Sequence, residues 1–543
     1  MSKVKKQSLM LAALTSSFGI FVSKALGLIY YSPLSLLAGE ENMAFYSIAY
    51  TYYDLLLKIS SAGIPFAIAA LVSRYYAKED YKTVLLIKKL GISIIMALTF
   101  IVALVFLLVS SPLSKQSMGN GASAQDINNL HTIFLILLIA VILVPFLSGI
   151  RGYYQGLKRL DLYGSSQVLE QFVRVFSIVG LGYLFVKVLH FNSIYAIYMA
   201  IAAASIGALV TIIFFLKFTK EDDIRINELI KTQTSKAVSK KILLNELISL
   251  SIPYLLISFL GSLSALINST FFMDTATKAG MDVTTAKLEM GILLANCNKL
   301  SSIPQVLTLG FSAGLVPYLS ESFERQDLKM LNKQIIQIVD TVLYILVPTI
   351  FVFIFFAKDI YFIMYGNSNL EVGTRLLRFY SLVTFTDTVA PIFSNIMIVL
   401  RQKKEATITL ICSCFIKLLS FFVLVKNFGS NGMTLSTAIS SLFVIISYMF
   451  ILKRNFKTRF ILTLRKLLLI LIASFIMIVP TLFIHNLINI AYTSRIIDIL
   501  VMGLCGIIML TIYYFVSVYF GLPQVIFGIK EVNPKAILKR FRA

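Results

Sequence analysis

Apolar runs of about 20 residues recur along the chain from residue 8 to residue 520. Each run is long enough to cross a hydrocarbon core of about 30 Å as an α-helix. Inside a bilayer the backbone must satisfy its own hydrogen bonds, so runs of this kind predict helices. We therefore predict an all-α polytopic membrane protein.

Glycine, proline and charged residues divide these runs into about fourteen transmembrane helices. With 58% hydrophobic and only 14% charged residues, the chain is more apolar than soluble domains. The predicted spans lie near residues 8–37, 44–73, 84–110, 130–157, 164–188, 193–217, 246–273, 287–320, 334–357, 376–400, 405–426, 432–452, 460–485 and 496–520.

The formal net charge of +23 does not indicate a nucleic-acid partner, because the basic residues lie in short loops between the spans. Lys and Arg gather at the N-terminus, in every second connecting loop and at the C-terminus. Under the positive-inside rule this alternation predicts that both termini are cytoplasmic.

The chain also contains a weak internal repeat. Gly63–Asp80 resembles Gly310–Asp327, on either side of one long hydrophilic connection. Six spans per repeat is an even number, so the repeats are parallel and predict two six-helix lobes around a central cavity, plus two extra C-terminal helices. The predicted domains are residues 1–218 (N-lobe), 219–245 (cytoplasmic linker), 246–453 (C-lobe) and 454–543 (two helices and a cytoplasmic tail).

Three lysines fall near mid-depth of predicted spans: Lys24, Lys58 and Lys299. Ionisable residues at that depth are costly and indicate function or internal pairing. An ammonium in a partly dehydrated cavity attracts phosphate, so we predict an anionic substrate bound by these lysines, with Asn298 and Tyr31 beside them. Asp54 lies one helical turn before Lys58, which predicts partial neutralisation of that lysine.

Other ionisable residues in the spans have alternative roles. Glu170 and Arg174 have the favourable four-residue spacing with the acid first, which predicts a structural pair. Asp340, Asp387 and Lys417 are candidates for binding or relaying a coupling cation, Na⁺ or H⁺. An internal salt bridge between Asp387 and Lys417 is an equal alternative.

Sequence motifs of enzymes are missing. The chain has no Walker loop, HExxH or GxSxG, and its four cysteines lie in apolar segments without metal-ligand spacing. We expect a transporter rather than an enzyme, with no metal site and no cofactor apart from a coupling cation.

Four segments resemble a known family: SKALGLIYYSPL (Ser23–Leu34), LLLKISSAGIPFAIAALV (Leu55–Val72), RGYYQG (Arg151–Gly156) and QVLEQFVRV (Gln167–Val175). They are similar to the polysaccharide-transporter branch of the multidrug/oligosaccharidyl-lipid/polysaccharide (MOP) exporter superfamily, most closely its lipid II flippases. The resemblance implies an alternating-access flippase that moves undecaprenyl-pyrophosphate-linked peptidoglycan precursor to the outer leaflet, driven by membrane potential or an ion gradient.

The resemblance also implies that basic residues on spans 1, 2 and 8 contact the pyrophosphate, and that spans 13 and 14 hold the lipid tail. Tyr31 replaces an arginine found in many relatives, so one charge is missing. The implied setting is the bacterial plasma membrane, with a lipid-linked glycan, anionic lipids and cell-wall synthesis enzymes as partners. Alternatives are a flippase for a capsule or teichoic acid unit, a cation-coupled multidrug exporter, or a non-transporting scaffold.

Overall fold

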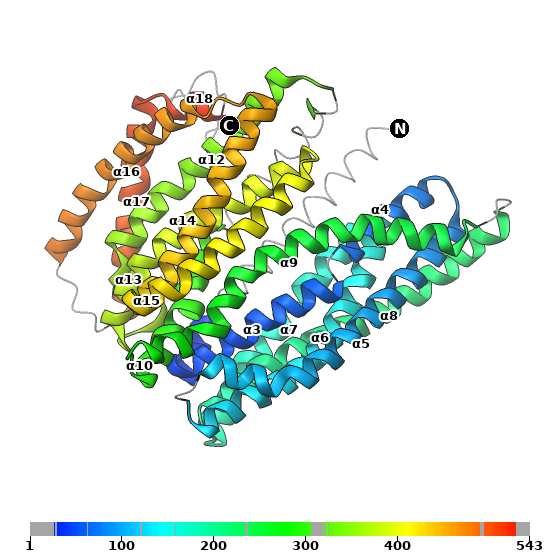
Figure 1. The fold of residues 1–543 in the computed structure, drawn as a ribbon, viewed down its shortest axis with the longest axis horizontal. Helices are drawn as coiled ribbons and strands as arrows, with labels where there is room; N and C mark the ends of the chain where they lie inside the picture. The colour runs from blue at the N-terminus through cyan, green and yellow to red at the C-terminus, as the bar shows by residue number, and fades with distance from the viewer. Residues whose placement is uncertain are drawn as a thin grey trace, which may run out of the picture. The chain divides into compact units, whose positions relative to one another are not determined.

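The computed structural model describes residues 27, 30–61, 63–119, 122–157, 159–233, 237–305, 319, 322–323, 325–488 and 494–527. These residues form helices joined by short connections, and no strand occurs among them (Figure 1). Within this described part, ten helical stretches are long and apolar enough to cross a membrane. The prediction of an all-α polytopic membrane protein is confirmed.

The chain forms two compact units, Met1–Ala295 and Asn296–Ala543. In the first unit, α9 (Lys240–Lys278) packs against α3, α4 and α5. The predicted domain limits assign most of this helix to the C-lobe, and they stay a prediction, because packing contacts do not show to which repeat a helix belongs. The helices of this unit are α2 (Tyr31–Ala38), α3 (Glu40–Ser61), α4 (Ile64–Ala77), α5 (Tyr81–Met118), α6 (Ala124–Gly156), α7 (Leu160–Tyr183), η1 (Leu184–Val188), α8 (Ile194–Thr232), α9 (Lys240–Lys278) and α10 (Val283–Gly291).

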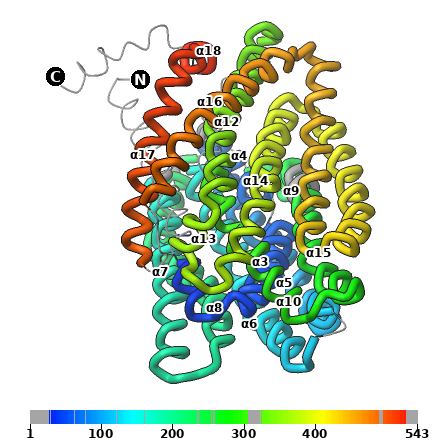
Figure 2. The backbone as a smooth tube through the Cα atoms, turned by 90° about the vertical axis from the view of Figure 1, so that its left-hand side faces the viewer, coloured from blue at the N-terminus to red at the C-terminus, as the bar shows by residue number. Residues whose placement is uncertain are grey.

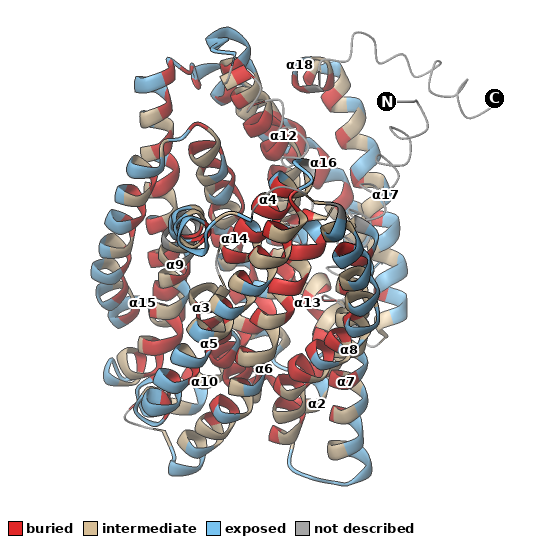
Figure 3. Ribbon diagram, turned by 90° about the vertical axis from the view of Figure 1, so that its right-hand side faces the viewer, coloured by how far each residue is buried: buried red, intermediate tan, exposed pale blue. Residues whose placement is uncertain are grey.

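The π-helical segment η2 (Ile292–Cys297) spans the boundary between the units. Exposed apolar side chains cover the outward faces of α15 and α17, as expected for helices that face lipid (Figure 3). The remaining helices of the second unit are α12 (Leu328–Phe355), α13 (Ala357–Tyr365), α14 (Leu370–Val399), α15 (Lys403–Phe456), α16 (Ile461–Ile488), α17 (Arg495–Tyr519) and α18 (Leu522–Phe527).

The predicted cytoplasmic linker is largely helical, because α8 continues to Thr232 and α9 begins at Lys240. The connection between them is held against the start of α5. Gln233 donates from its Nε2 to Asp80 at 2.8 Å, and the backbone N–H of Val238 donates to the Thr83 hydroxyl at 2.9 Å. These bonds fix the linker to the first unit.

One turn recurs at the two positions that the sequence repeat aligns. Asp80 caps α5 by accepting the backbone N–H of Thr83 at 3.1 Å, and Asp327 caps α12 by accepting that of Met330 at 2.9 Å. The residue before each aspartate has a positive φ, of 58° and 57°. Matching caps with matching backbone conformations support the internal repeat.

The predicted spans 405–426 and 432–452 are the two arms of α15, which lie side by side (Figure 2). The helix turns back at Gly429, whose φ of 54° and ψ of −131° are non-helical. Glycine has no Cβ, so it adopts this backbone conformation at low cost. Gly429 therefore permits the reversal of the chain in this hairpin.

Two buried side-chain pairs attach α16 to the helices before it. Lys466 on α16 contacts Asp340 on α12 at 2.5 Å, and His485 contacts Asp359 on α13 at 2.8 Å. Both pairs join residues that are 126 positions apart in the sequence. Asp340, a candidate for cation coupling, thus has a structural partner that the sequence analysis did not identify.

Candidate functional site

One face of α3 carries half-exposed polar residues. Tyr50, Asp54 and Lys58 follow one another at intervals of four, so they lie on the same side of the helix. Tyr50 is 42% exposed, and the side chains of Asp54 and Lys58 are 48% and 35% exposed. We call this set the α3 face.

Lys58 has two partners within the first unit. Its Nζ lies 2.5 Å from the Asp54 carboxylate and donates to the hydroxyl of Ser262 on α9 at 2.7 Å. The predicted neutralisation of Lys58 by its helix neighbour is present in the structure. Exposed ion pairs contribute about 1 kcal/mol or less, so a phosphate would compete with Asp54 for Lys58 at low cost.

Glu170 pairs with Arg151 rather than with Arg174. The Arg151 guanidinium lies 2.6 Å from the Glu170 carboxylate, and it also donates to the hydroxyl and the carbonyl of Ser166 at 3.0 and 2.8 Å. The predicted pair of Glu170 with Arg174 is wrong, since no ion pair joins these two described residues. The Arg151 guanidinium on α6 forms three hydrogen bonds with α7, one of them to Glu170. A single ion pair within α7 would form fewer bonds than this.

Arg174 instead lies among tyrosines. Its guanidinium is 5.9 Å from the centre of the Tyr50 ring and 6.0 Å from that of Tyr53. Its Nε is shielded from solvent without a hydrogen-bond partner, and no carboxylate of the described residues lies within 4 Å. The hydroxyls of Tyr30 and Tyr46, 2.9 Å apart, belong to the same environment. Aromatic faces hold a cation without neutralising its charge.

Tyr31 is part of this tyrosine cluster, but it is only 7% exposed. Its ring packs 5.3 Å from Tyr30 and 5.6 Å from Tyr46, measured between ring centres. Tyr31 therefore supports the cluster and does not reach the open α3 face. Lys24 lies outside the described residues.

The RGYYQG segment brings α6 close to α4. A Cβ on Gly152 would lie 2.4 Å from the Pro65 carbonyl oxygen, and one on Gly156 would lie 2.8 Å from that of Ala69. Only hydrogen fits at these two positions, so the glycines permit the close helix packing. Arg151 directly precedes Gly152 on α6.

The other predicted substrate residues lie in the second unit. Asn298 is exposed and Lys299 is half-buried, in helical residues that follow η2. Nearby, Asn296 donates to the Tyr361 hydroxyl at 3.0 Å, and Tyr365 donates to the Asn296 carbonyl at 3.2 Å. The structure thus places Lys58 and Lys299 in different units, and their joint role in one cavity stays a prediction.

Lys417 is fully buried between the arms of α15. Its ammonium donates to the hydroxyls of Ser436 and Thr437, each at 2.7 Å, while Asp387 accepts from Ser441 at 2.8 Å. No ion pair within 4 Å joins the two described residues Asp387 and Lys417, so the structure does not contain the alternative salt bridge. Their role in cation coupling stays a prediction. The described residues contain no cluster of three or more His, Cys, Asp or Glu that could hold a metal ion.

Comparisons with known proteins extend this description. A family model described as "Polysaccharide biosynthesis protein" matches residues 12–323. The lipid II flippase MurJ of Bacillus subtilis is 27% identical over 466 residues, 85% of each chain. Stage V sporulation protein B of the same organism is 24% identical over 369 residues, which are 67% of this chain and 68% of that one.

Solved structures share the fold. A lipid II flippase MurJ in an inward closed conformation matches with a TM-score of 0.64 and 17% identity, covering 93% of this chain and 98% of that one. An inward-facing multidrug resistance MATE family transporter of the MOP superfamily matches with a TM-score of 0.63 and 14% identity, covering 78% and 92%. The resemblance inferred from the four sequence segments is confirmed.

Proposed function

The chain belongs to the polysaccharide biosynthesis protein family, and from this premise we propose that it is a flippase that moves a lipid-linked glycan precursor across the bacterial membrane. The similarity to MurJ over 85% of both chains supports this class of substrate. We further propose lipid II as the precursor and alternating access as the mechanism, with both termini in the cytoplasm.

The observation that carries the proposal is the uncompensated charge of Arg174 beside the α3 face. Two cations border this face, with Lys58 near one end and Arg174 over the ring of Tyr50 near the other. Tyr50 and Lys58 are eight residues apart, so about 12 Å of helix axis separates them. A pyrophosphate bound at one cation could therefore move to the other while it stays close to a positive charge.

The same charges argue against a cation-coupled multidrug exporter. Cationic drugs bind to acidic groups, whereas Glu170 is occupied by Arg151 and Asp54 by Lys58. The likeness to a MATE transporter concerns the fold at 14% identity. An anionic substrate fits the site better.

Membrane potential is a sufficient driving force in this scheme. A cell interior that is negative favours outward movement of the anionic pyrophosphate by about 2.3 kcal/mol per elementary charge per 100 mV. We propose that the potential acts on the substrate's own charge. Ion coupling through Asp387 and Lys417 is then unnecessary for outward transport.

The test is the leaflet distribution of lipid II in cells depleted of this protein, with other flippases for lipid II removed. We expect outward exposure to fall at least tenfold, and the wild-type protein to restore it. Unchanged exposure of lipid II together with lost exposure of another lipid-linked glycan would reject lipid II but keep the class. Unchanged exposure of every such glycan would reject the flippase proposal.

A further inference from the structure

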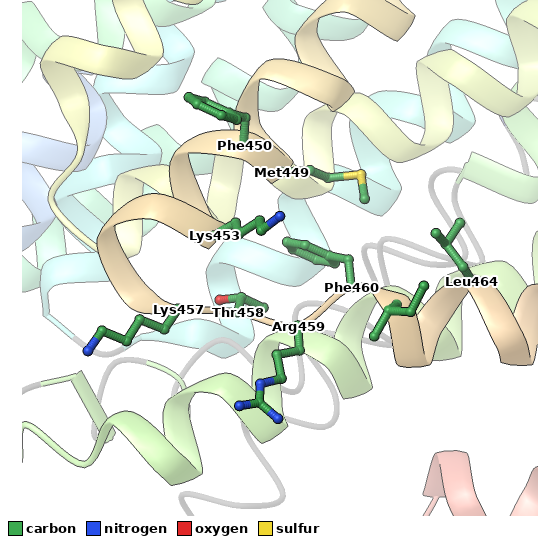
Figure 4. Close-up of a pocket in the computed structure, with 9 residues that line it drawn as sticks. Met449, Phe450, Lys453, Lys457, Thr458, Arg459, Phe460 and Leu464 are labelled. Atoms are coloured by element: carbon green, nitrogen blue, oxygen red, sulfur yellow. The ribbon is translucent and has the colours of Figure 1, made fainter.

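The turn between α15 and α16 borders a cavity of about 530 Å³. Three cations line it, Lys453, Lys457 and Arg459, together with apolar side chains that include Phe450 and Phe460 (Figure 4). Because this turn joins two consecutive membrane-spanning helices, the cavity lies at a membrane–water interface. Ligand sites typically have volumes of about 300–1,000 Å³, so this cavity is large enough for a headgroup.

The charge of the turn is uncompensated. Residues 453–459 (KRNFKTR) contain four basic residues and no acid. Lys453, Lys457 and Arg459 are exposed, and none of them forms an ion pair with a carboxylate in the described part of the chain. An anion that enters the cavity therefore meets cations without displacing an internal partner.

The turn is also held in place before any ligand binds. Lys457 ends α15 with a φ of 59°, and the buried hydroxyl of Thr458 donates to the side chain of Asn332 on α12 at 2.6 Å. Asn332 in turn donates to the carbonyl of Phe456 at 2.7 Å. A fixed turn lowers the ordering cost of binding, since less conformational freedom remains to be lost.

Apolar surface lies directly beside the cations. Phe450 is 65% exposed, Ile461 is 58% exposed and Leu464 is 48% exposed, and all three line the cavity. Figure 4 shows Lys457 and Arg459 extending from the turn. The exposed apolar residues continue the lipid-facing sides of α15 and α16. One cavity thus joins a site for an anion to a site for a hydrocarbon chain.

We propose that this cavity binds the phosphate of an anionic glycerophospholipid, with an acyl chain along Phe450, Ile461 and Leu464. Basic pockets at the ends of transmembrane helices suit such headgroups. On the predicted topology the turn faces the cytoplasm, where the anionic lipid is a neighbour in the inner leaflet. The proposal does not depend on the proposed transport function, because the α3 face belongs to the other unit.

The test is native mass spectrometry of the purified full-length protein with phosphatidylglycerol or phosphatidylcholine. We expect the wild-type protein to retain phosphatidylglycerol at least tenfold better than phosphatidylcholine. Each basic residue near a membrane surface contributes about 1 kcal/mol to the binding of anionic lipid, so Lys453→Gln with Arg459→Gln lowers the affinity on the order of tenfold or more.

The matched control is Lys403→Gln with Lys404→Gln, which removes two exposed charges at the start of α15 from residues that do not line the cavity. This control is expected to bind as the wild type does. Lys453→Arg with Arg459→Lys keeps both charges and is expected to retain binding, whereas Phe450→Ala is expected to weaken it severalfold.

Three results would overturn the proposal. Equal retention of the two lipids would show that the basic residues of the turn do not select an anionic headgroup. An equal loss in the control double variant would show that the cavity is not the site. Displacement of phosphatidylglycerol from the wild-type protein by equimolar undecaprenyl pyrophosphate would assign the cavity to the transported precursor instead.

Discussion

Arg151 and Glu170 form a 2.6 Å ion pair between α6 and α7, and this pair leaves Arg174, one turn further along α7, without a carboxylate. Two arginines close together in the fold thus have opposite electrostatic environments. Arg151 is part-buried and neutralised by Glu170, whereas Arg174 keeps its full charge beside the α3 face.

The first prediction contrasts these arginines. Arg174→Gln is expected to lower lipid II export at least tenfold while melting near the wild-type temperature, because removing this cation leaves no carboxylate without its partner. Arg151→Gln leaves Glu170 buried without its partner and is expected to cost about 3–5 kcal/mol of stability. Export in depleted cells and circular dichroism melting measure the two effects. Wild-type export by folded Arg174→Gln protein would contradict a substrate role.

A second prediction uses the absence of tryptophan from the sequence. Tyr50→Trp introduces a single indole beside Arg174. Its fluorescence is expected to change on titration with undecaprenyl pyrophosphate, and this change is expected to disappear when Arg174→Gln is added. Tyr183→Trp, at a 56% exposed position at the end of α7, is the control and should not respond. Equal responses with and without Arg174 would place the ligand elsewhere.

The third prediction concerns the neutralisation of Lys58. Asp54→Asn removes the carboxylate that competes for the ammonium, so the affinity for undecaprenyl pyrophosphate is expected to rise severalfold. Lys58→Gln is expected to lower it, and the double variant should match Lys58→Gln. Microscale binding measurements on purified protein separate these cases. Weaker binding by Asp54→Asn would mean that Asp54 positions Lys58 rather than competing with the ligand.

The fourth prediction concerns the RGYYQG segment. Gly152→Ala places a Cβ against the Pro65 carbonyl, so α6 and α4 must separate, at a cost of about 1–3 kcal/mol. Gly180→Ala is the control, because its added Cβ meets no atom closer than 4.0 Å. The control should be neutral or stabilising by up to about 1 kcal/mol. Thermal melting measures the stability of the two variants. Equal melting temperatures would exclude close packing as the role of Gly152.

The fifth prediction distinguishes packing from coupling at Lys417. Lys417→Met is expected to leave the melting temperature unchanged or higher, because Ser436 and Thr437 still donate to the Met433 carbonyl. Methionine is apolar and close to lysine in length, so it fills the site without the cost of burying an amine. If the substrate's charge alone drives export, this variant also exports normally. Loss of export with full stability would instead support ion coupling through Lys417.

The sequence was sufficient for features that depend on local pattern or on the repeat. Apolar length predicted the helices, the break near Gly429 separated two spans, and the aligned aspartates Asp80 and Asp327 adopt matching caps. Spacing along one helix also found the contact between Asp54 and Lys58.

Ion-pair partners that lie on other helices could not be predicted from spacing along one helix. Glu170 has a suitable arginine four residues away, yet Arg151 from another helix takes it, because helix packing brings that guanidinium closer. The contact of Lys466 with Asp340 was not predicted, since nothing in the sequence shows that α16 adjoins α12. An ion pair inferred from a four-residue spacing is therefore a hypothesis until the neighbouring helices are known.

The two side-chain pairs of α16, Lys466 with Asp340 and His485 with Asp359, have a mechanical consequence. Lys466 and His485 are nineteen residues apart on α16, which corresponds to about 28 Å of helix axis, and their partners Asp340 and Asp359 are also nineteen residues apart. The pairs thus secure α16 near both surfaces of a bilayer about 30 Å thick. Sliding α16 by one residue would break both pairs at once. In any rearrangement of the second unit, α16 is therefore expected to move with α12 and α13 as one rigid body.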